Sequence, residues 1–126
     1  MTRIFLSIAL VLGIIFIVPF LVDSVFTFTG RLTPPEGPPA QFLLGVLVSK
    51  MGTAAAFVLL FFLARGVWQG RWLSYALAWW LLFAFGEVGQ ALGPDYTWVE
   101  ALAGLLSETV YVPLSAWTTS RLLPVS

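Results

Sequence analysis

Four long apolar runs make up most of the chain, and short polar or proline-rich segments separate them. A helix needs roughly 20 consecutive apolar residues to cross a membrane, and each run reaches about that length. The connections after the second and third runs are too short for anything but a hairpin between neighbouring helices. The pattern predicts an all-α integral membrane protein with four transmembrane helices in an antiparallel up-down bundle. The expected helices are residues 4–28, 41–65, 72–92 and 97–120, in one domain that covers residues 1–126.

The segment from residue 30 to residue 40 is the longest expected connection. Four prolines within six residues, from Pro34 to Pro39, exclude a helix there and favour an extended, semi-rigid loop. We expect this loop to lie on the outer surface and to carry no catalytic residue. Gly93 and Pro94 form a second strong signal, because this pair typically ends a helix.

The first apolar run has two interpretations, a transmembrane helix or a cleaved signal peptide. Signal peptides have a hydrophobic region of roughly 7–15 residues that ends at small residues. The run from Ile4 to Val22 is longer, and Val22-Asp23-Ser24 is a poor cleavage site. We therefore expect a first transmembrane helix.

The positions of the arginines predict the orientation in the membrane. In the expected topology most of them lie on the side that carries both termini, and only Arg31 lies in a loop on the other side. Basic residues are enriched in cytoplasmic loops. We expect a multi-pass protein of the cell (inner) membrane with both termini in the cytoplasm. The arginines on the expected cytoplasmic side are Arg3, Arg65, Arg71 and Arg121.

Composition supports the membrane assignment and excludes several classes of function. Hydrophobic residues make up 60% of the 126 residues and charged residues only 10%, whereas soluble domains carry roughly 25% charged residues. The net charge is zero and no basic run could neutralise phosphates, so no nucleic-acid partner is expected. Because the chain has no cysteine and no histidine, thiol chemistry and the usual zinc, copper, haem and iron sites lack their ligands. We expect no cofactor and no bound metal.

Small residues at helical spacing suggest close helix packing. Gly52-x-x-x-Ala56 and Gly89-x-x-x-Gly93 resemble patterns that let two membrane helices approach each other. They could serve packing within the bundle or the seam of a homodimer. Besides membrane lipid, the expected partners are therefore a lipophilic small molecule and a second copy of the chain.

Three ionisable residues fall well inside the expected helices: Lys50 in the second, Glu87 in the third and Glu108 in the fourth. A charged side chain at the centre of a membrane helix costs roughly 2.5–3.5 kcal/mol even on lenient insertion scales, so such residues usually face the bundle interior and have partners. Residues three or four positions away share a helix face with them. Lys50, Glu87 and Glu108 are the candidate catalytic residues if the protein is an enzyme, and they are expected to point into one interior cavity. The candidate substrate-binding residues at helical spacing from them are Gln90, Tyr111, Ser115 and Thr53.

The charges of this set allow a structural or a functional role. In the structural interpretation Lys50 pairs with one glutamate, the other glutamate is protonated, and the set only orients the helices. In the functional interpretation the excess of carboxyls over amines raises the pKa of one carboxyl, as a proton-binding or acid-base site requires.

Three functions are compatible with these residues. The first is the binding or transport of a small, lipophilic or proton-coupled substrate. The second is a membrane-embedded isomerase, cyclase or hydrolase that acts on an isoprenoid or lipid with paired carboxyls as general acid and base. The third is an accessory subunit of a membrane complex. We favour the first, although no motif in the sequence names a reaction.

Overall fold

The computed structural model describes residues 2–30, 39–68 and 70–124, and the described residues form an all-α fold. The prediction of four long helices packed together is confirmed, and no expected helix end differs by more than two residues from the observed one. A short additional helix lies in the turn between the second and third long helices. In chain order the helices are α1 (Thr2–Phe28), α2 (Pro39–Leu63), α3 (Arg65–Trp68), α4 (Trp72–Ala91) and α5 (Trp98–Leu122).

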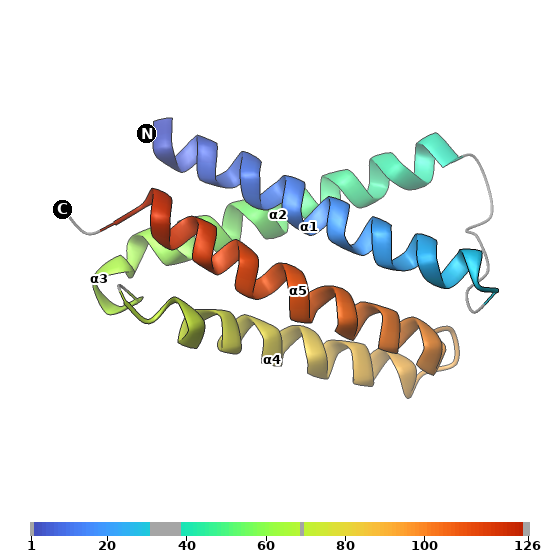
Figure 1. The fold of residues 1–126 in the computed structure, drawn as a ribbon. Helices are drawn as coiled ribbons and strands as arrows, with labels where there is room; N and C mark the ends of the chain where they lie inside the picture. The colour runs from blue at the N-terminus through green and yellow to red at the C-terminus, as the bar shows by residue number, and fades with distance from the viewer. Residues whose placement is uncertain (1, 31–38, 69, 125–126) are drawn as a thin grey trace.

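The long helices run alternately in opposite directions, so both chain termini lie at one end of the bundle (Figure 1). We call this the terminal end, which also carries α3, and we call the opposite end, with the α4–α5 turn, the turn end. Helix α5 packs against both α1 and α4, while α2 packs mainly against α1 and crosses it. Because α5 contacts two neighbours along its length, it has the most buried residues of the four long helices.

Local sequence signals explain where the helices begin. Helix α5 begins after Thr97, whose side chain accepts a hydrogen bond from the Glu100 backbone N–H, while the Glu100 carboxylate accepts one from the Thr97 backbone N–H. This reciprocal pair is a capping box. Helix α2 begins at Pro39, two residues earlier than expected, because proline is tolerated in the first turn of a helix. The rest of the proline-rich loop, residues 31–38, lies outside the described residues.

Aromatic side chains form the core of the terminal end. The rings of Phe57 and Phe61 on α2 each lie 5.0 Å from the ring of Tyr75 on α4, in edge-to-face arrangements. The Tyr75 hydroxyl donates a hydrogen bond to the backbone carbonyl of Phe57. Val11 on α1 and Val58 on α2 complete this layer and are fully buried. These contacts connect α2 to α4, although the two backbones do not pack closely.

Helix α2 leaves the core toward the turn end. No described side chain between Ala40 and Gly52 is buried, whereas Ala54, Phe57, Val58 and Phe61 are. Helices α4 and α5, by contrast, stay packed together, and buried residues occur as far as Ala91 and Ala101. At the turn end, α1, α4 and α5 therefore stay packed together, whereas the first half of α2 is exposed.

The small-residue patterns do not pack against the chain's own helices. A Cβ atom built on Gly52 or Gly89 would have no neighbour within 4 Å. Their partners Ala56 and Gly93 are exposed as well. The first of the two expected uses, packing within the bundle, is not seen at either pattern.

Two of the long helices are long and apolar enough to cross a membrane, namely Thr2–Phe28 and the Leu43–Leu63 part of α2. This criterion alone gives weak support, because the core helix of a soluble protein can also meet it. Only 17% of the apolar window in the first helix and 22% in the second are buried, however, whereas a core helix is mostly buried.

Candidate functional site

The carboxyl groups of Glu87 on α4 and Glu108 on α5 meet in the part of the bundle toward the turn end. They lie within hydrogen-bonding reach of each other. Two carboxyls can form such a bond only if one of them carries a proton. Glu108 is 5% exposed, and its Oε1 atom has no hydroxyl, amide or amine donor beside it among the described residues. The pair is therefore a place where one proton could be shared between two carboxyls.

Gly104 on α5 makes room for this contact. A Cβ atom at this position would overlap the Glu87 carboxyl group. Gly104 lies one turn before Glu108, so the Glu87 side chain passes over the α5 backbone before it reaches the second carboxyl. Of the ten described glycines, only Gly104 and Gly93 would bring an added Cβ within 4 Å of a neighbour, and only Gly104 meets a side chain.

Tyr96 in the α4–α5 turn contacts the pair from the turn end. Its hydroxyl donates a hydrogen bond of 2.5 Å to Oε2 of Glu87, and the backbone carbonyl of Glu100 lies 3.3 Å from the same hydroxyl. Burial raises the pKa of the Tyr96 phenol well above its usual value, and the hydrogen bond to Glu87 raises it further. The phenol stays neutral and acts as a donor.

Lys50 on α2 lies on the other side of the carboxyl pair. It is half-buried, and its Nζ atom lies 5.2 Å from the centre of the Tyr111 ring. The ammonium interacts electrostatically with the carboxyl groups of Glu108, Asp23 and Glu87. Among the described residues no carboxylate oxygen lies within 4.0 Å of Nζ, so Lys50 forms no direct ion pair there. The pairing required by the structural interpretation is thus absent from the described part of the chain.

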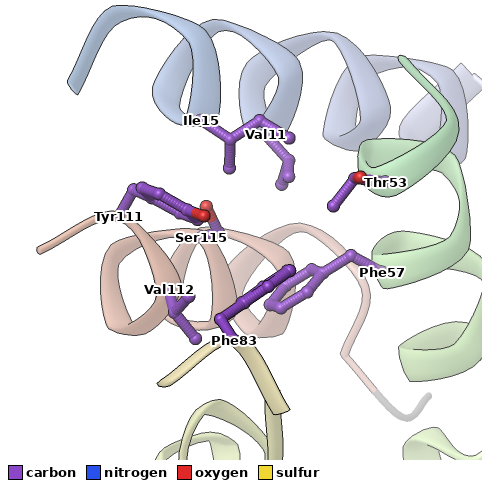
Figure 2. Close-up of a pocket in the computed structure, with 8 residues that line it drawn as sticks. All are labelled: Val11, Ile15, Thr53, Phe57, Phe83, Tyr111, Val112 and Ser115. Carbon is purple, nitrogen blue, oxygen red and sulfur yellow. The ribbon is translucent and has the colours of Figure 1, made fainter. Parts of the chain in front are cut away.

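A small interior cavity lies between α1, α2, α4 and α5 (Figure 2). Its volume is about 10 Å³, which is close to the space of one water molecule. It contains three predicted binding residues, Thr53, Tyr111 and Ser115, and the Ser115 hydroxyl is buried without a hydrogen-bond partner. The lining consists of Val11, Ile15, Thr53, Phe57, Phe83, Tyr111, Val112 and Ser115.

The prediction that one cavity collects all candidate residues differs from this geometry. Lys50 and the two glutamates do not line the interior cavity, and Gln90 is exposed on α4. Three residues of an α-helix advance by 300°, so Gln90 is rotated by about 60° from Glu87. Near the end of α4 this rotation is enough to expose the side chain.

A larger, open hollow runs along α2 toward the turn end. Its volume is about 420 Å³. Among the described residues, the polar groups in its lining are an amide, a hydroxyl and the Lys50 ammonium, with no carboxylate. The lining residues are Gln41, Gly45, Val46, Ser49 and Lys50.

Sequence reasoning missed Asp23 and Tyr96 as members of this region. Asp23 on α1 is exposed and interacts electrostatically with Lys50 and Glu87. The signal for Tyr96 was available, because Gly93 and Pro94 turn the chain back toward Glu87 nine residues earlier. No group of three or more acidic side chains in the described ranges could hold a metal ion.

No protein-family model, curated protein or solved structure matches the chain.

Proposed function

We propose that the protein is a four-span integral membrane protein that binds or transports a small lipophilic molecule and exchanges a proton at the Glu87–Glu108 pair. In this proposal α1, α2, α4 and α5 all cross the cell membrane and both termini are cytoplasmic. The bound molecule occupies the hollow along α2.

The apolar surface supports insertion into a membrane. Large hydrophobic side chains are exposed on all four long helices, and soluble monomers rarely expose contiguous apolar surface on this scale. Leu82 and Phe85 on α4, for example, are 63% and 74% exposed. A hydrocarbon environment would cover these side chains without a protein partner.

The arginines support the proposed orientation. Arg3 begins α1, Arg65 begins α3, Arg71 precedes α4, and Arg121 ends α5. All four therefore lie at the terminal end, as the positive-inside rule requires of a cytoplasmic side.

The observation that supports the proposed function is that Lys50 belongs both to the lining of the hollow and to the surroundings of the carboxyl pair. Lys50 lines the hollow, and its Nζ atom lies 5.2 Å from the centre of the Tyr111 ring, three residues after Glu108 on α5. If the Lys50 ammonium binds a ligand in the hollow, its positive charge stabilises the carboxylate charge of the pair less. The pair then holds a proton more tightly, so binding at one place and protonation at the other become linked.

The contact between the carboxyls favours proton binding over acid-base catalysis. General acid-base catalysis needs a substrate atom within hydrogen-bonding reach of each catalytic group. Glu87 and Glu108 reach each other, and the cavity between the four long helices, at about 10 Å³, has no space for a substrate. The hollow, at about 420 Å³, is within the size range of small-molecule sites.

Binding of three probes with the same hydrocarbon chain and different head groups tests this proposal. Purified protein in lipid nanodiscs is titrated with oleate, oleyl alcohol and oleylamine, and a pH indicator in weakly buffered solution reports proton uptake. We expect oleate to bind at least ten-fold more tightly than oleylamine, because the polar lining of the hollow is rich in donors, and to cause proton uptake. The wild-type protein should take up less than one proton per molecule of oleate bound, because the pair already holds a proton in part of the population.

Two variants and a control separate the roles of the residues. Glu108→Gln should keep the fold and bind oleate without proton uptake, because an amide cannot exchange a proton. Lys50→Met should remove the preference for oleate. Arg121→Gln removes a cation at the terminal end, over the Trp117 ring, and should change neither measurement. Failure of all three probes to bind, or binding of oleate with no proton uptake by the wild type, would refute the proposal.

A further inference from the structure

Ser115 on α5 differs from the other buried serine and threonine residues in the described part of the chain. Ser7, Ser107 and Thr119 each donate a hydrogen bond to the backbone carbonyl four residues earlier in the same helix. Ser115 is fully buried, and its Oγ atom has no hydrogen-bond partner among the described residues. Buried polar atoms nearly always bond to a protein group or to an ordered water. The Ser115 hydroxyl therefore indicates a partner other than the described protein atoms.

The Ser115 side chain lines the interior cavity between α1, α2, α4 and α5 (Figure 2). The cavity volume of about 10 Å³ is the space that one water molecule needs and is too small for a larger ligand. Two other hydroxyl-bearing residues line the same space, Tyr111 on α5 and Thr53 on α2. A buried water needs roughly two to four polar partners, so the three hydroxyl-bearing side chains are enough to hold one.

We propose that this cavity binds one water molecule and that the Ser115 hydroxyl is its main hydrogen-bond partner. The hydroxyl can donate one hydrogen bond to the water and accept another. Thr53 Oγ1 already donates a hydrogen bond of 3.3 Å to the Ser49 carbonyl, so its lone pairs are left to accept one from the water. Glu87 and Glu108 do not line this cavity, so the water site does not depend on the proposed function.

The water site lies where α2 leaves the core. No described residue of α2 before Thr53 is buried, whereas Ala54, directly after it, is fully buried. The backbones of α2 and α5 do not pack closely. A water between Thr53 and Ser115 supplies a contact between these helices that direct backbone packing does not. Loss of the water should therefore loosen α2 from α5 and leave the α4–α5 contact intact.

Water-edited solid-state NMR of the protein in phosphatidylcholine bilayers tests this site. The method measures how fast proton magnetisation passes from water to nearby carbon atoms. Val11 and Val58 are a matched pair, because both are fully buried but only Val11 lines the cavity. We expect the Val11 methyl groups to receive magnetisation from water several-fold faster than the Val58 methyl groups.

Ser115→Ala removes the hydroxyl that holds the water, and Ser107→Ala is its control. Ser107 is a buried serine on the same helix, but its hydroxyl bonds to the Ala103 carbonyl and does not line the cavity. In Ser115→Ala the transfer to Val11 should fall to the rate at Val58, and in Ser107→Ala it should be unchanged. Ser115→Ala should also lower the equilibrium constant for folding about five-fold, because a buried hydrogen bond is lost. Unfolding with sodium dodecyl sulfate in mixed micelles measures this loss.

Three results would overturn the water site, and none of them bears on oleate binding or proton uptake. Equal transfer to Val11 and Val58 in the wild type would show that no water occupies the cavity. Fast transfer to Val11 that persists in Ser115→Ala would show that Ser115 does not hold the water. A gain in stability in Ser115→Ala would show that the wild-type hydroxyl has no partner, because removal of an unsatisfied buried hydroxyl is favourable.

Discussion

The terminal end and the turn end of the bundle are built from different interactions. At the terminal end Phe57, Phe61 and Tyr75 pack edge to face, and α2 is buried against its neighbours. Toward the turn end no described residue of α2 before Thr53 is buried. The carboxyl pair of Glu87 and Glu108 lies there in place of an aromatic core. The terminal end holds the helices together. At the turn end the first half of α2 is exposed.

This division separates the aromatic core from the site at which we propose proton exchange. Regions with few buried apolar contacts open locally at low free energy, and binding sites are commonly drawn from such regions. Helix α2 is fixed by its second half, so its first half can respond to a ligand without disturbing the aromatic core. The following substitutions probe the two ends separately, in order of decreasing effect.

Phe61→Ala should cause the largest loss of stability, because it empties the aromatic core of the terminal end. Phe61 is fully buried, and removal of a buried phenylalanine side chain costs about 3–5 kcal/mol. Leu60→Ala is the control on the same helix, since Leu60 is 51% exposed and should cost less than about 1 kcal/mol. Unfolding by titration with sodium dodecyl sulfate in mixed micelles measures both. Equal losses would contradict the assignment of the core.

Gly104→Ala should lower the free energy of unfolding by about 1–3 kcal/mol, because the added methyl group displaces the Glu87 carboxyl. Gly89→Ala adds a methyl group on the exposed face of α4 and should be neutral or slightly stabilising.

A double variant identifies the cause of the Gly104 effect. Truncation of the clashing side chain in Glu87→Ala/Gly104→Ala should restore part of the lost stability. Additive losses in the double variant would show that the methyl group disturbs something other than Glu87.

The number and bounds of the long helices could be predicted because apolar runs and helix-stop signals are local. The capping box of Thr97 and Glu100 and the stop at Gly93 fix the α4–α5 turn without help from distant residues. Proline in the first turn of α2 moved one boundary, which the rule for proline at helix starts would have allowed. Insertion of all four helices in a membrane stays a prediction, as does the orientation.

For the candidate site, the sequence predicted only which residues are energetically costly to bury in a membrane. The expense of burying Glu87 and Glu108 indicated that they need partners, but it did not reveal that they contact each other across Gly104. That contact depends on the rotation of α4 relative to α5, which the apolar pattern leaves open because both helices are apolar around most of their circumference. The same uncertainty in rotation explains why Gln90 was expected inside and lies outside.

Thr97→Ala should have a moderate effect, confined to the turn end. Loss of an N-cap side chain costs about 1 kcal/mol, and here it also removes the partner of Glu100 at the base of the turn that carries Tyr96. Thr118→Ala is the control on α5, because the Thr118 hydroxyl bonds only to a carbonyl within its own helix. Hydrogen exchange of the first turn of α5 should increase in Thr97→Ala and not in Thr118→Ala. Unchanged exchange in both variants would contradict a capping role.

Gln90→Leu should have the smallest effect, and it tests whether the turn end is open on the face of α4 that carries Gln90. Gln90 is exposed and its side chain forms no hydrogen bond with the described residues, so the free energy of unfolding should change by less than about 0.5 kcal/mol. Proton uptake on addition of oleate should also be unchanged, because the residue lines neither the cavity nor the hollow. Ala91→Leu is the contrasting variant one position further along, where the side chain is buried and the added volume should destabilise the α4–α5 contact. A large loss of proton uptake in Gln90→Leu, with stability unchanged, would contradict this expectation. It would mean that the binding site includes this face of α4 in addition to the hollow along α2.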